Sequence, residues 1–260
     1  MAIPKAKILC RPVLAALVLT SVAVAAEVEK TRAAEPAATG KPAPAATAET
    51  AQPLPPPPDR FIELPGGASV NAARRTVALP VEVVNLSGGL EFLLTLGKTK
   101  DYEAVLSTTV AGTLLHFALR SAGMEAAEVS PDANFEEKLK AQLEKGTRVE
   151  IAVQFAGDDK PRPLQQLLLW SDKSPLEKAE WYFAGSYFKN EEGANVYAAD
   201  RSLCLIASYP TPEMVIGPTF AVDNPYKDGS KRYLIPNTQA LPPVGTQGRL
   251  FIQAKAVAAP

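Results

Sequence analysis

The sequence has few of the residues that build most catalytic and metal sites. Its 260 residues include one histidine and two cysteines. This scarcity excludes zinc fingers, iron–sulfur clusters, two-histidine zinc proteases and disulfide scaffolds, because each needs several of these side chains. An excess of charge of one sign is also absent, since 27 Lys and Arg oppose 28 Asp and Glu. The charge balance therefore indicates no nucleic-acid partner, and no strong membrane partner for the mature protein.

The N-terminal residues have the composition of a secretory signal peptide. An apolar run over residues 13–26 ends near the small-residue pattern Ala23-Val24-Ala25. The run follows three cations, Lys5, Lys7 and Arg11. We expect residues 1–25 to be a signal peptide cleaved after Ala25, which predicts an exported, periplasmic or cell-surface protein. A retained membrane anchor is the alternative, although the run of roughly 14 residues is short of the roughly 20 that a bilayer core requires.

Residues 26–58 form a segment rich in alanine and proline that ends in four consecutive prolines. No aromatic residue occurs before Phe61. Such a segment cannot bury enough apolar surface to offset its conformational entropy, so the composition predicts a disordered, partly extended linker. A proline-rich recognition ligand is the alternative interpretation.

Residues 59–255 are predicted to be one folded α+β domain, and all 18 aromatic residues lie within it. Apolar and polar residues alternate over 77–83, 90–96 and 149–155, as in strands with one buried face. The glycines that follow Asn85 suit a hairpin, and the chain turns again before residues 102–106, which predicts a β-meander. Pro80 lacks an N–H donor and favours an edge position for the first strand. Further strands are expected at 164–170, 180–188, 203–209 and 249–253.

Two helices are expected between these strands. The segment 107–123 carries an apolar stripe and ends at Gly123, and the segment 130–146 opens with Ser-Pro and ends at Gly146. The fold class expected from the pattern is thus a mostly antiparallel β-sheet, a β-meander, with two helices packed on it.

Several blocks of the folded part resemble the YdjY-type domain family of exported bacterial proteins. They are Gly89–Phe92, Lys100–Leu106, His116–Gly123, Trp181–Phe188 and Pro242–Thr246, spread over residues 75–253. The resemblance implies export and a shared fold, and it brings no assigned activity. Where the family reads Lys-x-His-Glu-Ser, this chain has Lys100-Asp101-Tyr102-Glu103-Ala104. Some members have been labelled ferredoxin-like, but one cysteine after signal removal cannot hold an iron–sulfur cluster.

His116 is the only imidazole, so a general base of the usual kind must be this residue. On a helical wheel it lies away from the apolar stripe, beside Arg120. A catalytic interpretation joins His116 to Glu103 and Asp200 as orienting carboxylates and to Ser186 as nucleophile. The alternative is a polar histidine on a solvated flank of the helix.

No metal site or cofactor is expected. Cys204 lies among apolar residues, which is typical of a buried, inert thiol, with a redox-active cysteine as the alternative. The acidic segments 190–195 and 223–229 lack calcium-loop spacing and are interpreted as turns.

The aromatic block 181–188 has two interpretations. Alternation along a strand places Trp181 and Phe183 on one face and Tyr182 with Phe188 on the other. Either the block only packs in the core, or Trp181, Tyr182 and Tyr187 offer a stacking surface for a ligand.

From these features we expect an exported binding or structural module of the cell envelope, whose partner is an unknown glycan or peptide component. The sequence favours this hypothesis over an enzyme. The alternative is an acid–base hydrolase that uses the four catalytic candidates.

Overall fold

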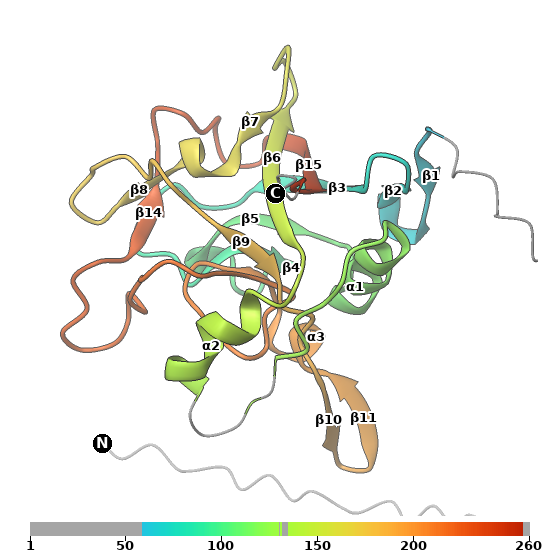
Figure 1. Cartoon of the computed structure of the whole chain (residues 1–260). Coiled ribbons are helices and arrows are strands. Elements are labelled where there is room, and N and C mark those ends of the chain that lie inside the picture. The colour runs from blue at the N-terminus through green and yellow to red at the C-terminus, as the bar shows by residue number, and fades with distance from the viewer. Residues whose placement is uncertain (1–58, 130, 132–134, 257–260) are drawn as a thin grey trace, which may run out of the picture. The chain divides into compact units, whose positions relative to one another are not determined.

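A computed structural model describes residues 59–129, 131 and 135–256 (Figure 1). The expected signal peptide, residues 1–25, and the expected linker, residues 26–58, lie outside the described residues.

Eight strands form a closed, mixed β-barrel. Around the ring the order is β3-β15-β6-β9-β13-β12-β4-β5, and pairing of β5 with β3 closes it. The strands are β3 (Thr76–Val83), β4 (Phe92–Leu96), β5 (Ala104–Thr108), β6 (Arg148–Phe155), β9 (Trp181–Phe183), β12 (Cys204–Ala207), β13 (Ile216–Pro218) and β15 (Gln247–Ala254). Two neighbouring pairs, β4 with β5 and β12 with β13, are parallel. The predicted fold class, a β-meander sheet with two helices packed on it, is therefore wrong.

Short strands, helices and turns lie outside the eight strands of the barrel. Strands β1 (Ile62–Glu63) and β2 (Ser69–Asn71) extend the sheet beside β3, and β7 (Arg162–Pro163) pairs with β6. Two small sheets pair β10 (Phe188–Glu191) with β11 (Ala194–Tyr197) and β8 (Leu168–Trp170) with β14 (Leu234–Pro236). The helices are α1 (Gly112–Ser121), α2 (Phe135–Leu143) and α3 (Ala198–Ser202), with 3-10 turns η1 (Pro65–Gly67), η2 (Asp101–Glu103) and η3 (Leu164–Leu167).

The meander prediction failed at both of its connections. The predicted hairpin after Asn85 does not form, because β5 lies between β3 and β4. The connection from β4 to β5 joins parallel strands rather than antiparallel ones. Residues 97–103, which include η2, carry the chain back along β4, so that Leu94 and Leu106 pair in parallel register. Seven residues reach about 24 Å when extended, more than the roughly 17 Å length of a five-residue strand. A short loop between two alternating segments therefore does not require a hairpin.

Pro80 lies in the interior of the sheet, so its predicted edge position is also wrong. On one side β3 pairs with β15 along its length, including Pro80 opposite Arg249. On the other side β2 pairs with residues 76–78 and β5 with residues 82–83. Pro80 thus occupies the gap between two partners, where a missing N–H donor interrupts no ladder.

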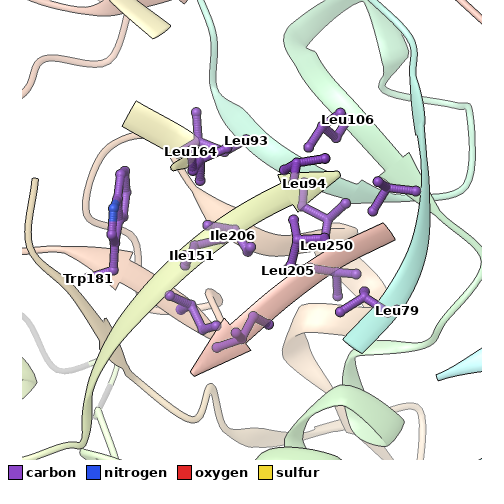
Figure 2. Packing of buried hydrophobic residues seen from close by; sticks show 14 of the residues in the cluster. Leu79, Leu93, Leu94, Leu106, Ile151, Leu164, Trp181, Leu205, Ile206 and Leu250 are labelled. Atoms are coloured by element: carbon purple, nitrogen blue, oxygen red, sulfur yellow. The ribbon is translucent and has the colours of Figure 1, made fainter. Parts of the chain in front are cut away.

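The inward-facing side chains of the strands fill the barrel. Leu250 of β15 lies directly between Leu79 of β3 and Val153 of β6, and all three are fully buried. Figure 2 shows Leu94, Leu205 and Leu250 among the side chains of this interior cluster. Strands far apart in the sequence thus meet in one hydrophobic core, which provides the main favourable contribution to folding.

The helices cover different parts of this core. Helix α1 forms within the predicted segment 107–123, and its buried Leu115 and Leu119 belong to the main core. Helix α2 forms within the predicted segment 130–146, and Leu139 and Leu143 contact a second cluster that includes Cys204. Helix α3 was not expected; it follows β11 and contacts α1.

Candidate functional site

A pocket of about 620 Å³ opens beside His116. Three parts of the described chain line it: α1, residues 126–129 and 131 after α1, and the turn 185–187 with the start of β10. The lining residues are His116, Arg120, Ala126, Glu128, Val129, Pro131, Gly185, Ser186, Tyr187, Phe188 and Lys189. The pocket thus combines one imidazole, two cations and one carboxylate with apolar and aromatic side chains.

Two oxygen atoms hold the imidazole of His116 through Nδ1. The carbonyl oxygen of Gly185 and the hydroxyl oxygen of Tyr197 each lie 2.9 Å from Nδ1. The Tyr197 hydroxyl donates to the same carbonyl at 2.6 Å. The ring also makes edge contacts with Phe183 and Tyr197, with centroids 5.0 and 5.8 Å apart. His116 is therefore fixed in one orientation rather than free on a solvated flank.

These contacts assign the proton of the neutral imidazole. A carbonyl oxygen only accepts hydrogen bonds, so the short approach of Gly185 requires an N–H at Nδ1. The Tyr197 hydroxyl gives its hydrogen to Gly185 and can accept from Nδ1 with its oxygen. The other ring nitrogen, Nε2, then carries a lone pair, and it has no hydrogen-bond partner among the described residues. Nε2 can accept a hydrogen bond, or donate one once the ring is protonated.

The surroundings of His116 favour its neutral form. Burial lowers the pKa of His116 below its ordinary value of 6.5, and the charge of Arg120 adds to this effect. The Gly185 carbonyl and the carboxylate of Glu128 oppose it. The net direction is a lowered pKa, so the imidazole is neutral at pH 7 and Nε2 keeps its lone pair.

The turn that holds His116 has a special backbone. Gly185 and Ser186 have positive φ angles of 92° and 51°. A Cβ on residue 185 would lie 2.6 Å from Cβ of Ala126, so the turn requires glycine there. The N–H of Gly185 donates to Val215, whereas the N–H groups of Ser186 and Tyr187 have no partner among the residues described. Two adjacent backbone donors of the pocket wall are thus unused.

Ser186 shares the pocket with His116, but its hydroxyl serves α3. The Oγ atom accepts the N–H of Ala199 at 3.1 Å, near the start of that helix. Ser186 is only 7% exposed. This capping role accounts for Ser186 without nucleophilic chemistry.

Asp200 caps a different helix. It accepts the N–H groups of Gly112 and Thr113 and the hydroxyl of Thr113, at the N-terminus of α1. A carboxylate there compensates the unpaired donors and the positive end of the helix dipole. Asp200 therefore stabilises α1, and it binds this helix about one turn before His116.

Glu103 belongs to a separate polar cluster. The backbone N–H of Glu91 donates to its carbonyl oxygen at 2.9 Å. Burial raises the pKa of Glu91, and the neighbouring Glu103 carboxylate raises it further. Tyr209 donates to Glu91 at 3.4 Å and accepts from Asn224 at 2.9 Å. The structure therefore brings Ser186 to His116, but not Glu103, and it gives Asp200 a helix-capping position.

Four of the five segments that carry the family resemblance meet in pairs at these two places. Residues 116–123 and 181–188 border the His116 pocket, and residues 89–92 and 100–106 adjoin the Glu91 cluster. A protein-family model, the YdjY domain, matches residues 69–253, which is most of the chain. The chain belongs to the YdjY domain family. Comparison of this YdjY domain with the curated proteins and with the solved structures gave no significant match.

The aromatic residues of the YdjY domain divide between core and surface. Trp181 is 2% exposed and packs against Phe220, with ring centroids 5.2 Å apart. Tyr182 and Tyr187 are half-buried, and only Tyr187 lines the His116 pocket. Trp181 thus offers no accessible face for stacking, whereas Tyr187 does. Phe188 also lines the pocket and is 58% exposed, and the sequence analysis did not select it as a ligand contact.

Cys204 of the YdjY domain is fully buried, and burial raises the pKa of its thiol. Such a thiol is a poor nucleophile, in agreement with the inert interpretation. Within the described part of the chain, no three His, Cys, Asp or Glu side chains cluster as metal ligands would. No described helix is long and apolar enough to cross a membrane.

Sequence reasoning missed Tyr197, Lys189 and Glu91. Tyr197 reaches His116 from β11, and its role depends on the turn at Gly185. Lys189 lies directly after the aromatic block, and only the folded structure shows that it lines the pocket. The alternation of residues 180–188 gave no signal for either contact, because the strand breaks at the positive φ angles of Gly185 and Ser186.

Proposed function

We propose that this YdjY domain is an exported binding module of the cell envelope, and that its ligand occupies the His116 pocket. The observation that carries the proposal is the orientation of His116. Its Nδ1 is held by Gly185 and Tyr197, while Nε2 has no partner among the described residues of a pocket of about 620 Å³. A preformed pocket with apolar walls and a few oriented polar groups is typical of small-ligand sites.

Export rests on the sequence of residues 1–25. Their three cations, apolar run and Ala-Val-Ala pattern support a cleaved signal peptide, and the alanine- and proline-rich residues 26–58 support a spacer between envelope and domain.

Binding accounts for the site better than hydrolysis does. A nucleophile must lie within hydrogen-bond reach of its base, with a third group orienting that base. Here a backbone carbonyl orients His116, the hydroxyl of Ser186 receives an α3 N–H, and Asp200 caps α1. A hydrolase mechanism would require Ser186 and Asp200 to give up the hydrogen bonds with which they cap α3 and α1.

The binding proposal is tested on the imidazole signals of His116, which need no assignment because the chain has one histidine. Soluble peptidoglycan fragments, which carry both glycan and peptide, are added to the purified protein during proton NMR. We expect the His116 signals to move in a saturable manner. Absence of any change at millimolar fragment concentrations would contradict the proposal.

Two exposed phenylalanines provide a matched pair of variants. Phe188 lines the pocket and is 58% exposed, whereas Phe117 of α1 is 57% exposed and does not line it. Phe188→Ser should weaken fragment binding by about tenfold, the effect of losing roughly 1.4 kcal/mol of apolar contact. Phe117→Ser should leave binding unchanged; an equal loss in both variants would place the ligand elsewhere.

Export is tested separately by cell fractionation and N-terminal analysis of the secreted chain. The expected product begins at Ala26 and is recovered from the periplasm or cell surface. Recovery in the cytoplasm with Met1 or residue 2 at the N-terminus would contradict export.

A further inference from the structure

We propose that the His116 pocket is an anion site that holds a carboxylate on an apolar ligand, with His116, Arg120 and the backbone N–H groups of Ser186 and Tyr187 as its donors. This inference rests on the proposed binding function and names the chemical class of the ligand for that pocket.

The unused backbone donors are the first support. The N–H groups of Ser186 and Tyr187 follow each other in the turn, both residues line the pocket, and neither N–H has a partner among the described residues. Ser186 is almost completely buried. A buried N–H without an acceptor is unfavourable, so an incoming oxygen atom that accepts from it would relieve this cost. Consecutive N–H groups in a turn with left-handed residues form concave sites suited to anions.

The charges of the pocket wall are the second support. Arg120 and Lys189 are cationic, and the carboxylate of Glu128 is the only anionic side chain among the described lining residues. The partners of the two cations, Glu125 and Glu191, do not line the pocket. The Arg120–Glu125 pair is largely exposed and therefore weak, so Arg120 can turn toward a ligand at small cost. The lining carries a net charge of +1 while His116 is neutral.

The apolar residues of the pocket favour a ligand that carries an apolar group. Val129, Pro131 and the exposed ring of Phe188 stand beside the polar donors in the same pocket. A bare anion would leave this surface in water, whereas a carboxylate joined to an apolar or aromatic group would cover it. An apolar carboxylate matches both parts of the pocket.

Anion binding should be coupled to protonation of His116. The charged and titratable groups around its ring are Arg120 and Glu128, with the hydroxyl of Tyr197 at Nδ1 and with Lys189 and Tyr187 across the pocket. A bound carboxylate adds a negative charge near Nε2, which favours the imidazolium and lets Nε2–H donate to the ligand. The same linkage makes binding tighter as the pH falls through the pKa that His116 has in the complex.

Benzoate is the probe, and the proton NMR titration of His116 is the readout. Acetate tests the anion without the ring, benzyl alcohol tests the ring without the anion, and inorganic phosphate tests a different oxyanion. We expect benzoate at saturation to raise the pKa of His116 by about one unit, equal to about tenfold tighter binding to the protonated ring. Acetate should act in the same direction more weakly, and benzyl alcohol should not change the pKa.

Two matched variants test whether benzoate binds in the His116 pocket. Arg120→Gln should weaken benzoate binding by about tenfold. Arg74→Gln, which breaks a similar exposed ion pair with Asp59 away from the pocket, should leave it unchanged. An equal loss of benzoate affinity in both variants would overturn the inference. So would a His116 pKa that does not change at saturating benzoate, or phosphate binding that is tighter than benzoate binding.

The result also separates this inference from the binding function. If peptidoglycan fragments move the His116 signals but none of the anions does, the carboxylate site is wrong and the binding module stands. If benzoate binds and the fragments do not, the anion site stands and peptidoglycan is excluded as its source.

Discussion

Nδ1 of His116 and the carbonyl oxygen of Gly185 lie 2.9 Å apart, across 69 residues of sequence. The contact joins α1 to the turn that follows β9, and Tyr197 of β11 completes it. Because this arrangement uses one side of the imidazole for structure, the other nitrogen is left for the pocket. Each prediction below tests a part of this arrangement or of the fold that supports it.

The Tyr197 hydroxyl contributes a buried hydrogen bond to Gly185. Tyr197→Phe should lower the free energy of unfolding by about 1 kcal/mol, the usual net value of such a bond, when measured by urea denaturation. The Nδ1–H tautomer of His116 should persist, because Gly185 remains as acceptor. Tyr226→Phe is the control, since the Tyr226 hydroxyl also donates to a carbonyl, that of Gly89, but at the surface. A larger loss in the control than in Tyr197→Phe would contradict the assignment.

Gly185 is required for two reasons, its positive φ and its contact with the segment after α1. Gly185→Ala should destabilise the protein by more than about 1 kcal/mol and move the His116 signals, because the new methyl group would meet Ala126 and Cε1 of His116. Gly245→Ala has a similar φ of 89° with open space around it. Gly245→Ala should therefore lose only the stability that a positive φ costs a non-glycine residue. Equal stability of the two variants would mean that the turn does not contact residue 126.

Asp200 is predicted to have a structural role. Asp200→Ala removes the acceptor for the first N–H groups of α1 and should cost about 1 kcal/mol of stability. Asp200→Asn keeps a capping oxygen and should lose less. Thermal unfolding monitored by circular dichroism distinguishes the two variants. A neutral effect of Asp200→Ala on stability would show that the cap contributes nothing.

Glu91 should make stability depend on pH. Its folded-state pKa lies above the ordinary value of 4.5, so the folded protein holds this proton more tightly than the unfolded chain does. The corresponding stability is present below pH 4.5 and is lost as the pH rises through the raised pKa. Glu91→Gln stays neutral and should remove this loss, seen as a smaller fall in unfolding free energy between pH 4.5 and 7.

Glu82 is a control for Glu91, because its pKa is shifted in the opposite direction. Hydrogen bonds from Lys98 and Gln247 lower the pKa of Glu82, so its contribution is present above pH 4.5 and is lost as the pH falls. Glu82→Gln should therefore reduce stability at neutral pH. The same pH profile in both variants would contradict the placement of Glu91.

Local patterns predicted the individual elements better than their arrangement. The alternation at residues 77–83 and 149–155 matches β3 and β6, and the stripe of residues 107–123 contains α1. The barrel, however, is closed by β3 pairing with β5 and by β15 inserting between β3 and β6. Those partners are far apart in the sequence, and alternation defines which face of a strand is buried without naming its neighbour.

The site was predictable to a similar extent. Counting histidines selected His116, and local glycine context selected Ser186, which lies in the same pocket. The parts supplied by other strands, Tyr197 and Lys189, had no local signal. Glu103 was grouped with His116 as a carboxylate on the preceding strand and Asp200 as a further carboxylate, and the fold gives both of them other contacts.

The held imidazole of His116 is tested by a long-range proton–nitrogen NMR correlation of the single histidine, recorded on the purified protein from pH 4.5 to 8. We expect the Nδ1–H tautomer at neutral pH and a pKa below 6.5, because Gly185 accepts from Nδ1 and burial disfavours the imidazolium. An Nε2–H tautomer that titrates at about 6.5, as in an exposed peptide, would contradict both the held imidazole and the pocket built around it.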